Sequence, residues 1–133
     1  MAAVLGTLIA AVPAARADVI IFIANKSVKA SEISRSEARD VFLGDSSSVG
    51  GSHVVPTVLQ TDEVHEAFLQ IVGRSKSAFQ VTWRKQVFTG KGMMPHSCTG
   101  EEEMISYVSA TPGAIGYISG NKTVSGVKVL KLR

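Results

Sequence analysis

The chain has little of several residue types that mark specialised proteins. Its 133 residues include one cysteine, one tryptophan and four prolines, and 6% of them are aromatic. A single cysteine excludes a framework of intramolecular disulfides. The absence of a compositional bias or a heptad run excludes low-complexity, collagen-like and coiled-coil chains. Since 45% of the residues are hydrophobic and the length is typical of one domain, the sequence favours a single globular domain.

Charge is also sparse. Lys and Arg number 14 against 11 Asp and Glu, and no run of Lys and Arg is present. Without such a run we expect no nucleic-acid partner, although the mild basic excess is compatible with an anionic ligand. The chain also lacks a nucleophile elbow, an HExxH motif and a pair of cysteines, so we predict that it is no enzyme and needs no organic cofactor.

The longest apolar run stands at the start. Residues 1–17 read MAAVLGTLIAAVPAARA and end in an Ala-x-Ala pattern at Ala15 and Ala17. The run is shorter than a membrane span of about 20 residues, so we predict a signal peptide over residues 1–17 and a periplasmic or otherwise exported domain over residues 18–133. No basic residue precedes the apolar core, which leaves a buried or membrane-lying helix as the alternative. Loss of Arg16 leaves 13 basic and 11 acidic residues, a net charge of +2.

Strand-like and helix-like segments alternate after that point. Runs of β-branched or alternating apolar residues predict four strands, at residues 18–24, 53–59, 114–119 and 127–132. Capping residues predict four helices, beginning at Ser34, Thr61, Ser75 or Ser77, and Thr99. Gly44 and Gly73 are expected to end the first two. The fold class is therefore α/β or α+β, with a mixed sheet of about four strands flanked by about four helices.

Helical spacing also predicts which side chains of these helices enter the core. The expected core positions are Ala38, Val41, Phe42, Val64, Ala67, Phe68, Ile71, Phe79, Trp83, Val87, Met104, Ile105 and Val108.

Four segments resemble one family. In order they read VIIFIANKSV, ISRSEARDVFLGD, FQVTWRKQVFTGKG and ATPGAIGYIS, and the most specific pieces are residues 41–44 and 112–117. Together they resemble the phosphate-binding proteins of ABC phosphate importers, and more closely the short exported chains that keep part of that fold. The resemblance implies one lobe of a type II periplasmic binding protein-like fold, and a solute-binding role with phosphate or another oxyanion as ligand.

The sequence departs from that family in two respects. The resemblance implies a second lobe that closes on the anion, and we expect this lobe to be absent. It also implies an Arg-Ser-Asp-Gly-Ser-Gly-Thr stretch where residues 60–66 read QTDEVHE. Asp62 and Glu63 would repel a dianion there, which counts against phosphate at that place.

The absent lobe also suggests a second hypothesis. An interaction protein could keep the fold without transport, with a homodimer or a protein partner covering the face of the missing lobe. Tight ligand binding by a single lobe would need the same kind of cover.

Helix N-termini and one glycine-rich loop supply the candidate anion-binding residues. Free N–H groups and a partial positive charge favour anions at a helix N-terminus. The candidates are Ser34, Arg35, Ser36, Thr61, Thr89 and Lys91. The alternative for Ser34 is helix capping alone, and the alternative for Lys91 is a solvated loop charge.

The stretch MMPHSC gathers soft metal donors. Met93, Met94, His96 and Cys98 lie within six residues, and thioether and thiolate ligands favour Cu(I). As a minor hypothesis this loop binds Cu(I). The alternative is that the methionines fill a gap in the core and Cys98 packs as a small hydrophobic residue.

Overall fold

The computed structural model describes residues 20–60, 63–92, 94–122 and 124–133. The predicted signal peptide at residues 1–17 and the two candidate site residues Thr61 and Met93 lie outside these ranges. Among the described residues, the helices are all too short or too polar to cross a membrane.

Six strands form one mixed sheet, which takes in all four predicted strands. Their order is β2 (Glu32–Ile33), β8 (Lys128–Leu132), β1 (Ile20–Ala24), β7 (Ala114–Ser119), β5 (Val55–Leu59) and β6 (His96–Cys98). β1 is antiparallel to both β7 and β8, whereas β5 is parallel to β7 and to β6. A separate hairpin joins β3 (Ser48–Val49) and β4 (Ser52–His53).

The two extra strands of the large sheet, β2 and β6, contain two and three residues. The prediction of a loop over residues 93–98 was wrong for residues 96–98. Three residues are too few for a period of two to be recognised in a sequence, and β6 forms because it pairs with β5 from His96 to Cys98.

The four helices of the described ranges follow the predicted order: α2 (Arg35–Phe42), α3 (Glu63–Val72), α4 (Lys76–Phe88) and α5 (Glu101–Ala110). The capping box at Ser34 and the Ser75 cap are confirmed. The cap predicted at Thr99 was wrong, because Gly100 is the N-cap residue. Thr99 instead donates its backbone N–H and its hydroxyl to the Glu103 carboxylate, at 2.9 and 2.7 Å.

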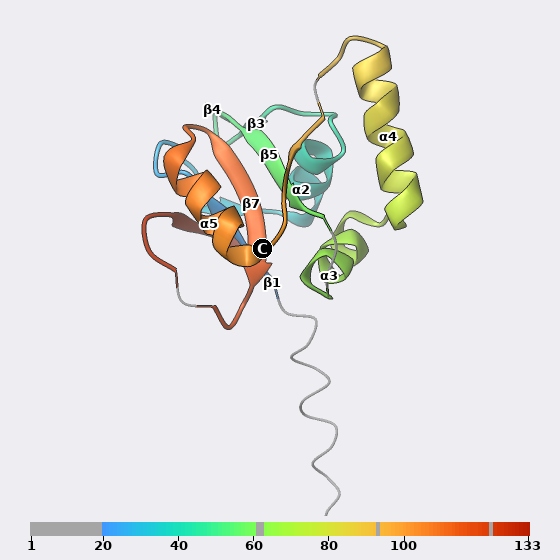
Figure 1. Cartoon of the computed structure of the whole chain (residues 1–133). Coiled ribbons are helices and arrows are strands. Elements are labelled where there is room, and N and C mark those ends of the chain that lie inside the picture. Colours follow the sequence, from blue (N-terminus) through green and yellow to red (C-terminus); the bar gives the residue numbers. More distant parts are fainter. Residues whose placement is uncertain (1–19, 61–62, 93, 123) are drawn as a thin grey trace, which may run out of the picture.

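The helices cover the two faces of the sheet unequally. α5 lies against one face, α2 and α3 lie against the other, and α4 stands apart beyond α3 (Figure 1). On the α5 face, β7 passes so close to Met104 that a Cβ at Gly116 would collide with its sulfur. This close approach explains the second glycine of the stretch at residues 112–117.

Aromatic rings fill the core between the sheet and α2 and α3. Phe68 stacks on Tyr117 with ring centroids 4.1 Å apart, and Phe42 packs against Phe22, Phe68 and Tyr117. Most predicted core positions are buried, namely Ala38, Val41, Phe42, Ala67, Phe68, Phe79, Trp83, Met104 and Val108. Val64, Ile71 and Ile105 are half-buried. The prediction for Val87 was wrong: it is 41% exposed, because α4 packs only along one narrow side.

Candidate functional site

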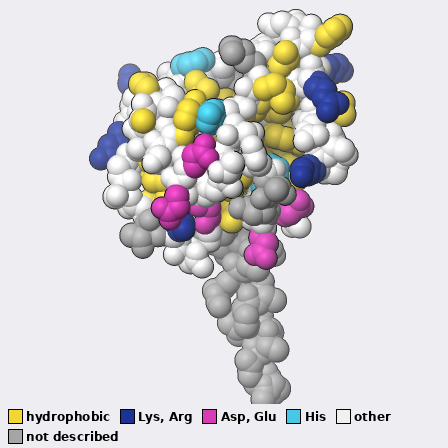
Figure 2. Space-filling model, in the orientation of Figure 1, with side chains coloured by type: hydrophobic (Ala, Val, Ile, Leu, Met, Phe, Trp, Pro, Cys, Tyr) yellow, Lys and Arg dark blue, Asp and Glu magenta, His cyan; other side chains and the backbone are white. Residues whose placement is uncertain are grey.

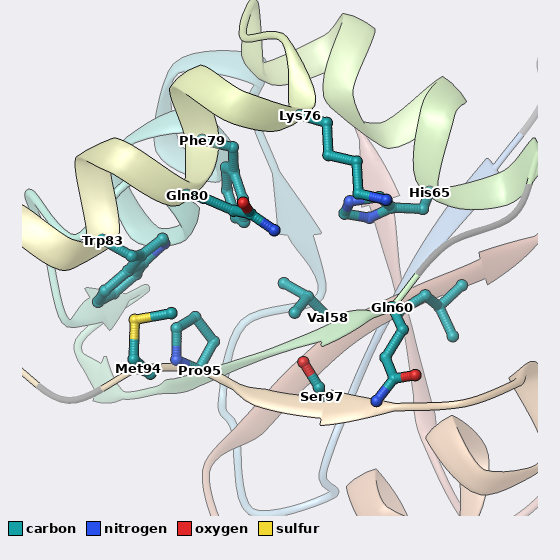
Figure 3. A pocket seen from close by; sticks show the side chains of 11 residues that line it. Val58, Gln60, His65, Lys76, Phe79, Gln80, Trp83, Met94, Pro95 and Ser97 are labelled. Atoms are coloured by element: carbon teal, nitrogen blue, oxygen red, sulfur yellow. The ribbon is translucent and has the colours of Figure 1, made fainter.

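A pocket of about 360 Å³ opens between α3 and α4 on one side and β5 and β6 on the other. It lies at the carboxyl end of β5, the end of a parallel strand at which open α/β sheets bind their ligands. Its lining residues are Val58, Leu59, Gln60, His65, Lys76, Phe79, Gln80, Trp83, Met94, Pro95 and Ser97 (Figure 3).

The polar part of this lining comprises one cation, the amide and hydroxyl groups of two glutamines and a serine, which can donate hydrogen bonds, and His65. Figure 3 shows Lys76, Gln80 and Ser97 directed into the space between α4 and the strands. Gln60 follows β5 directly and donates its backbone N–H to the Cys98 carbonyl at 2.9 Å. Among the described residues, neither Asp nor Glu lines the pocket. The lining therefore suits a ligand that accepts hydrogen bonds and carries negative charge.

Local geometry explains how two of these side chains reach the pocket. Side chains of a strand alternate between faces, so Ser97 points toward Val58 and the pocket while its neighbours His96 and Cys98 point toward α5. Lys76 is the first residue of α4, directly after the Ser75 cap. The amino end of α4 therefore adds its partial positive charge near the lysine.

His65 forms the wall of the pocket next to the core. The side chain is 3% exposed, and its Nδ1 lies 2.5 Å from the Tyr117 hydroxyl oxygen. The same oxygen accepts the backbone N–H of Leu59 at 2.9 Å. The imidazole also stacks on Phe68, with ring centroids 5.7 Å apart. These contacts join the pocket wall to β5 and to the core.

The predicted anion site at the start of α2 lies far from this pocket. Ser34 follows β2, at the opposite edge of the sheet from β6. Its hydroxyl accepts the backbone N–H of Glu37 at 3.0 Å, and its own N–H donates to the Glu37 carboxylate at 2.9 Å. Glu37 also pairs with Arg133 at 3.2 Å. A carboxylate thus already stands at this helix N-terminus, beside Arg35 and Ser36.

Thr89 and Lys91 lie at the other end of α4 from Lys76. Thr89 is the C-cap residue, and its hydroxyl donates to the Lys85 carbonyl at 2.9 Å. Lys91 lines a second, more open pocket of about 580 Å³, together with Ser46 and Ser47. The structure thus does not bring the described anion candidates together: they occupy the start of α2, the end of α4 and this second pocket.

The soft donors of the MMPHSC stretch are partly brought together. His96 and Cys98 lie on the α5 side of β6, where Glu103 joins them, and the ligand atoms of the three residues lie within 4.8 Å of one another. Met94 lines both pockets, the second of them together with His96. Burial and the nearby Glu103 carboxylate raise the pKa of the Cys98 thiol to about 11. Hydrogen bonds from Thr99 lower the pKa of Glu103.

Sequence reasoning missed several residues of the first pocket: Gln60, His65, Lys76, Gln80 and Ser97. Of these residues, Gln60 could have been predicted from the sequence, because it follows a predicted strand and precedes a predicted helix. That position is typical of ligand contacts in α/β folds. Lys76 and Gln80 have no such signal, since an isolated Lys and Gln on a helix indicate only a solvated surface.

Several solved structures are similar in fold to this chain. A phosphate ABC transporter substrate-binding protein from Clostridium perfringens, with bound phosphate, matches with a TM-score of 0.67 at 19% identity, over 85% of this chain and 44% of its own length. An ABC-type phosphate transport receptor from Vibrio cholerae matches with a TM-score of 0.66 at 14% identity, over 85% and 45% of the two chains. PstS from Borrelia burgdorferi matches with a TM-score of 0.63 at 17% identity, over 86% and 47%.

These likenesses establish the fold. The chain spans less than half the length of these structures, and the predicted periplasmic binding protein-like α/β fold is confirmed over that part. No protein-family model and no curated protein matches the chain.

Proposed function

We propose that this chain is an exported solute-binding domain that binds an oxyanion such as phosphate in the pocket between α4 and β6. The observation that carries the proposal is the lining of that pocket. Lys76 supplies a cation, Gln60, Gln80 and Ser97 supply donors, and none of the lining residues within the described ranges is acidic. A ligand at this place would also lie at the carboxyl end of β5, as expected for an α/β fold.

The proposed site explains how an anion could bind although the family's arginine is absent. A Lys76 ammonium can form a charge-assisted hydrogen bond with an oxyanion, worth about 1.5–3 kcal/mol. The likeness to a receptor that holds phosphate supports phosphate as the first ligand to test. The pocket is open on one side, so a single chain is expected to bind weakly.

Thermal unfolding of the full chain with phosphate tests this proposal. Phosphate at a hundredfold excess over its Kd should raise Tm on the order of 10 °C. Lys76→Gln should weaken phosphate binding about tenfold or more, because it removes the cation from the pocket. Lys85→Gln is the matched control, since it removes the same charge from the last turn of the same helix. Calorimetric titration gives the affinities of both variants.

Two results would contradict the proposed site. If Lys76→Gln and Lys85→Gln weaken phosphate binding equally, the loss of affinity comes from the lower positive charge of the molecule as a whole. The pocket is then not the binding site. If instead Arg35→Ala or Lys91→Gln abolishes the phosphate effect while Lys76→Gln does not, the anion binds at the start of α2 or in the second pocket.

A second candidate function, a protein interaction, is favoured by the surface of α4. Four of the five exposed large hydrophobic residues in the described part of the chain, Val81, Val87, Phe88 and Met94, lie on α4 or just after it, and the fifth, Val129, lies on β8. The same segment carries Arg74, Lys76, Arg84, Lys85 and Lys91 and no acidic residue. Figure 2 shows yellow and dark blue side chains gathered over this part of the molecule. Two such surfaces would repel each other, so we propose an acidic protein partner with an apolar patch rather than a homodimer.

This interaction predicts that Phe88→Ser and Arg84→Glu each weaken association with an acidic partner by about tenfold or more, because Phe88 and the cation are its expected contacts. The measurement is pull-down from the periplasm of the producing cell, followed by titration with the purified partner. Lys29→Glu, which changes a charge on the loop after β1, is the control. Equal binding by all three variants would contradict a role for α4.

A further inference from the structure

β6 presents a second set of functional groups on the face opposite the pocket. His96 and Cys98 are separated by one residue, so both side chains leave β6 toward α5. Glu103 of α5 reaches the same place. One nitrogen, one sulfur and one oxygen, each able to bind a metal, lie within 4.8 Å of one another. Three donors of different type from two elements are therefore gathered at one point.

Other contacts hold the two exposed members of this cluster. The His96 imidazole stacks on Tyr107 of α5, with ring centroids 3.9 Å apart and an interplanar angle of 3°. The Glu103 Oε1 atom accepts two hydrogen bonds from Thr99, and the Oε2 atom takes no part in them. Such supporting contacts orient metal ligands in proteins. Cys98 is fully buried beneath them and is anchored by the pairing of β6 with β5.

An independent feature of β5 points to the same place. Thr57 pairs with His96 across the parallel strands, so its side chain leaves the sheet on the same face. Its hydroxyl is fully buried and has no hydrogen-bond partner among the described residues. A buried hydroxyl without a partner costs about 1–3 kcal/mol. A polar group bound next to His96 would remove that cost.

We propose that His96, Cys98 and Glu103 form a Zn²⁺ site with three protein ligands and one open position. The mixture of sulfur, nitrogen and oxygen ligands is typical of zinc. It suits Cu(I) less well, because the carboxylate is a hard ligand. Bonds of about 2.0–2.3 Å require the ligand atoms to move closer than 4.8 Å. The side chains of His96 and Glu103 are exposed, so they can approach Cys98 at the expense of the Tyr107 stacking and the Thr99 hydrogen bonds.

Titration of the full, reduced chain with Co²⁺ tests the site, because a cobalt–thiolate bond gives a charge-transfer absorption band. We expect one equivalent of Co²⁺ to produce this band and Zn²⁺ to displace it. Cys98→Ser should abolish the band. His96→Gln should weaken Co²⁺ binding at least tenfold, while His53→Gln, a change of the same kind in the β4 hairpin, should not. Cys98 is buried, so Cys98→Ser could prevent folding. His96 is exposed, so His96→Gln tests the site without that risk.

Glu103 has a matched control in its neighbour. Glu103→Gln should weaken Co²⁺ binding at least tenfold, whereas Glu102→Gln removes the same charge from a carboxylate that pairs with Lys122 and should change nothing. Absence of the band would overturn the proposal, as would equal effects of the two variants. Loss of Cu(I) binding on Met94→Leu without any Zn²⁺ binding would instead support the copper hypothesis. Lys76→Gln should leave Co²⁺ binding unchanged. The proposed zinc site and the proposed oxyanion pocket are therefore tested independently of each other.

Discussion

Phe42→Ala is expected to lower the free energy of unfolding by about 3–5 kcal/mol, the usual effect of removing a fully buried phenyl ring. The Phe42 ring is 0% exposed and meets three other aromatic rings, with centroids 4.9 Å from Phe68, 5.8 Å from Phe22 and 5.9 Å from Tyr117. Its removal leaves a cavity between α2, α3 and the sheet. Urea unfolding followed by circular dichroism measures the change.

Phe88→Ala is the matched control for that prediction. It removes the same ring from the last residue of α4, where the side chain is 91% exposed. We expect it to change stability by less than about 0.5 kcal/mol. Equal destabilisation by the two variants would contradict the packing described for the core, because it would require Phe88 to be buried as deeply as Phe42.

Much of the fold could be predicted because its signals are local. The Ser34 capping box and the Ser75 cap mark the beginnings of two helices, and the structure contains both. Gly44 has a φ of +86°, a conformation that glycine adopts without strain, so it could be predicted to end α2. The long apolar strands β1 and β7 are likewise visible in the sequence. Short elements such as β6 are not, since pairing with a neighbouring strand creates them.

The pocket could not be predicted for the same reason. Lys76 and Ser97 are 21 positions apart in the chain and come together only because α4 folds back over β5 and β6. Sequence reasoning grouped neighbours instead, and so combined Ser34 with Arg35 and Met93 with Cys98. Where the chain is extended, that approach succeeded in part: His96 and Cys98 do share a face of β6. Their third neighbour, Glu103, comes from a helix and was missed.

His65 shows a further limit of the sequence. A single histidine among charged residues indicates a surface position, yet its ring is packed among Phe68, Phe79 and Tyr117. The apolar stripe expected on α3 includes Val64 and Ile71, whereas the structure buries His65, Leu69 and Val72 together with Ala67 and Phe68. α3 is therefore rotated relative to the prediction, because the hydroxyl of Tyr117 gives the imidazole a polar partner inside the core.

Tyr117→Phe is expected to lower the free energy of unfolding by about 2–4 kcal/mol although it removes a single oxygen atom. The hydroxyl meets the backbone N–H of Leu59 and the Nδ1 of His65, and both groups are buried. Each buried polar group that loses its partner costs about 1–3 kcal/mol. Because His65 and Leu59 line the pocket, we also expect phosphate to bind more weakly to this variant.

Tyr107→Phe is the control for Tyr117→Phe: it also removes a tyrosine hydroxyl, but from α5, which lies on the opposite face of the sheet from α3 and His65. Tyr107 is half-buried on α5 and contacts His96 through its ring, which phenylalanine retains. We therefore expect it to change stability by less than about 0.5 kcal/mol and to leave phosphate binding unchanged. Urea unfolding and calorimetric titration of both variants measure the difference. If Tyr117→Phe were as stable as Tyr107→Phe, the hydroxyl would not hold β5 and α3 together. The pocket wall would then depend on ring packing alone, because phenylalanine keeps the ring that Tyr117 stacks on Phe68.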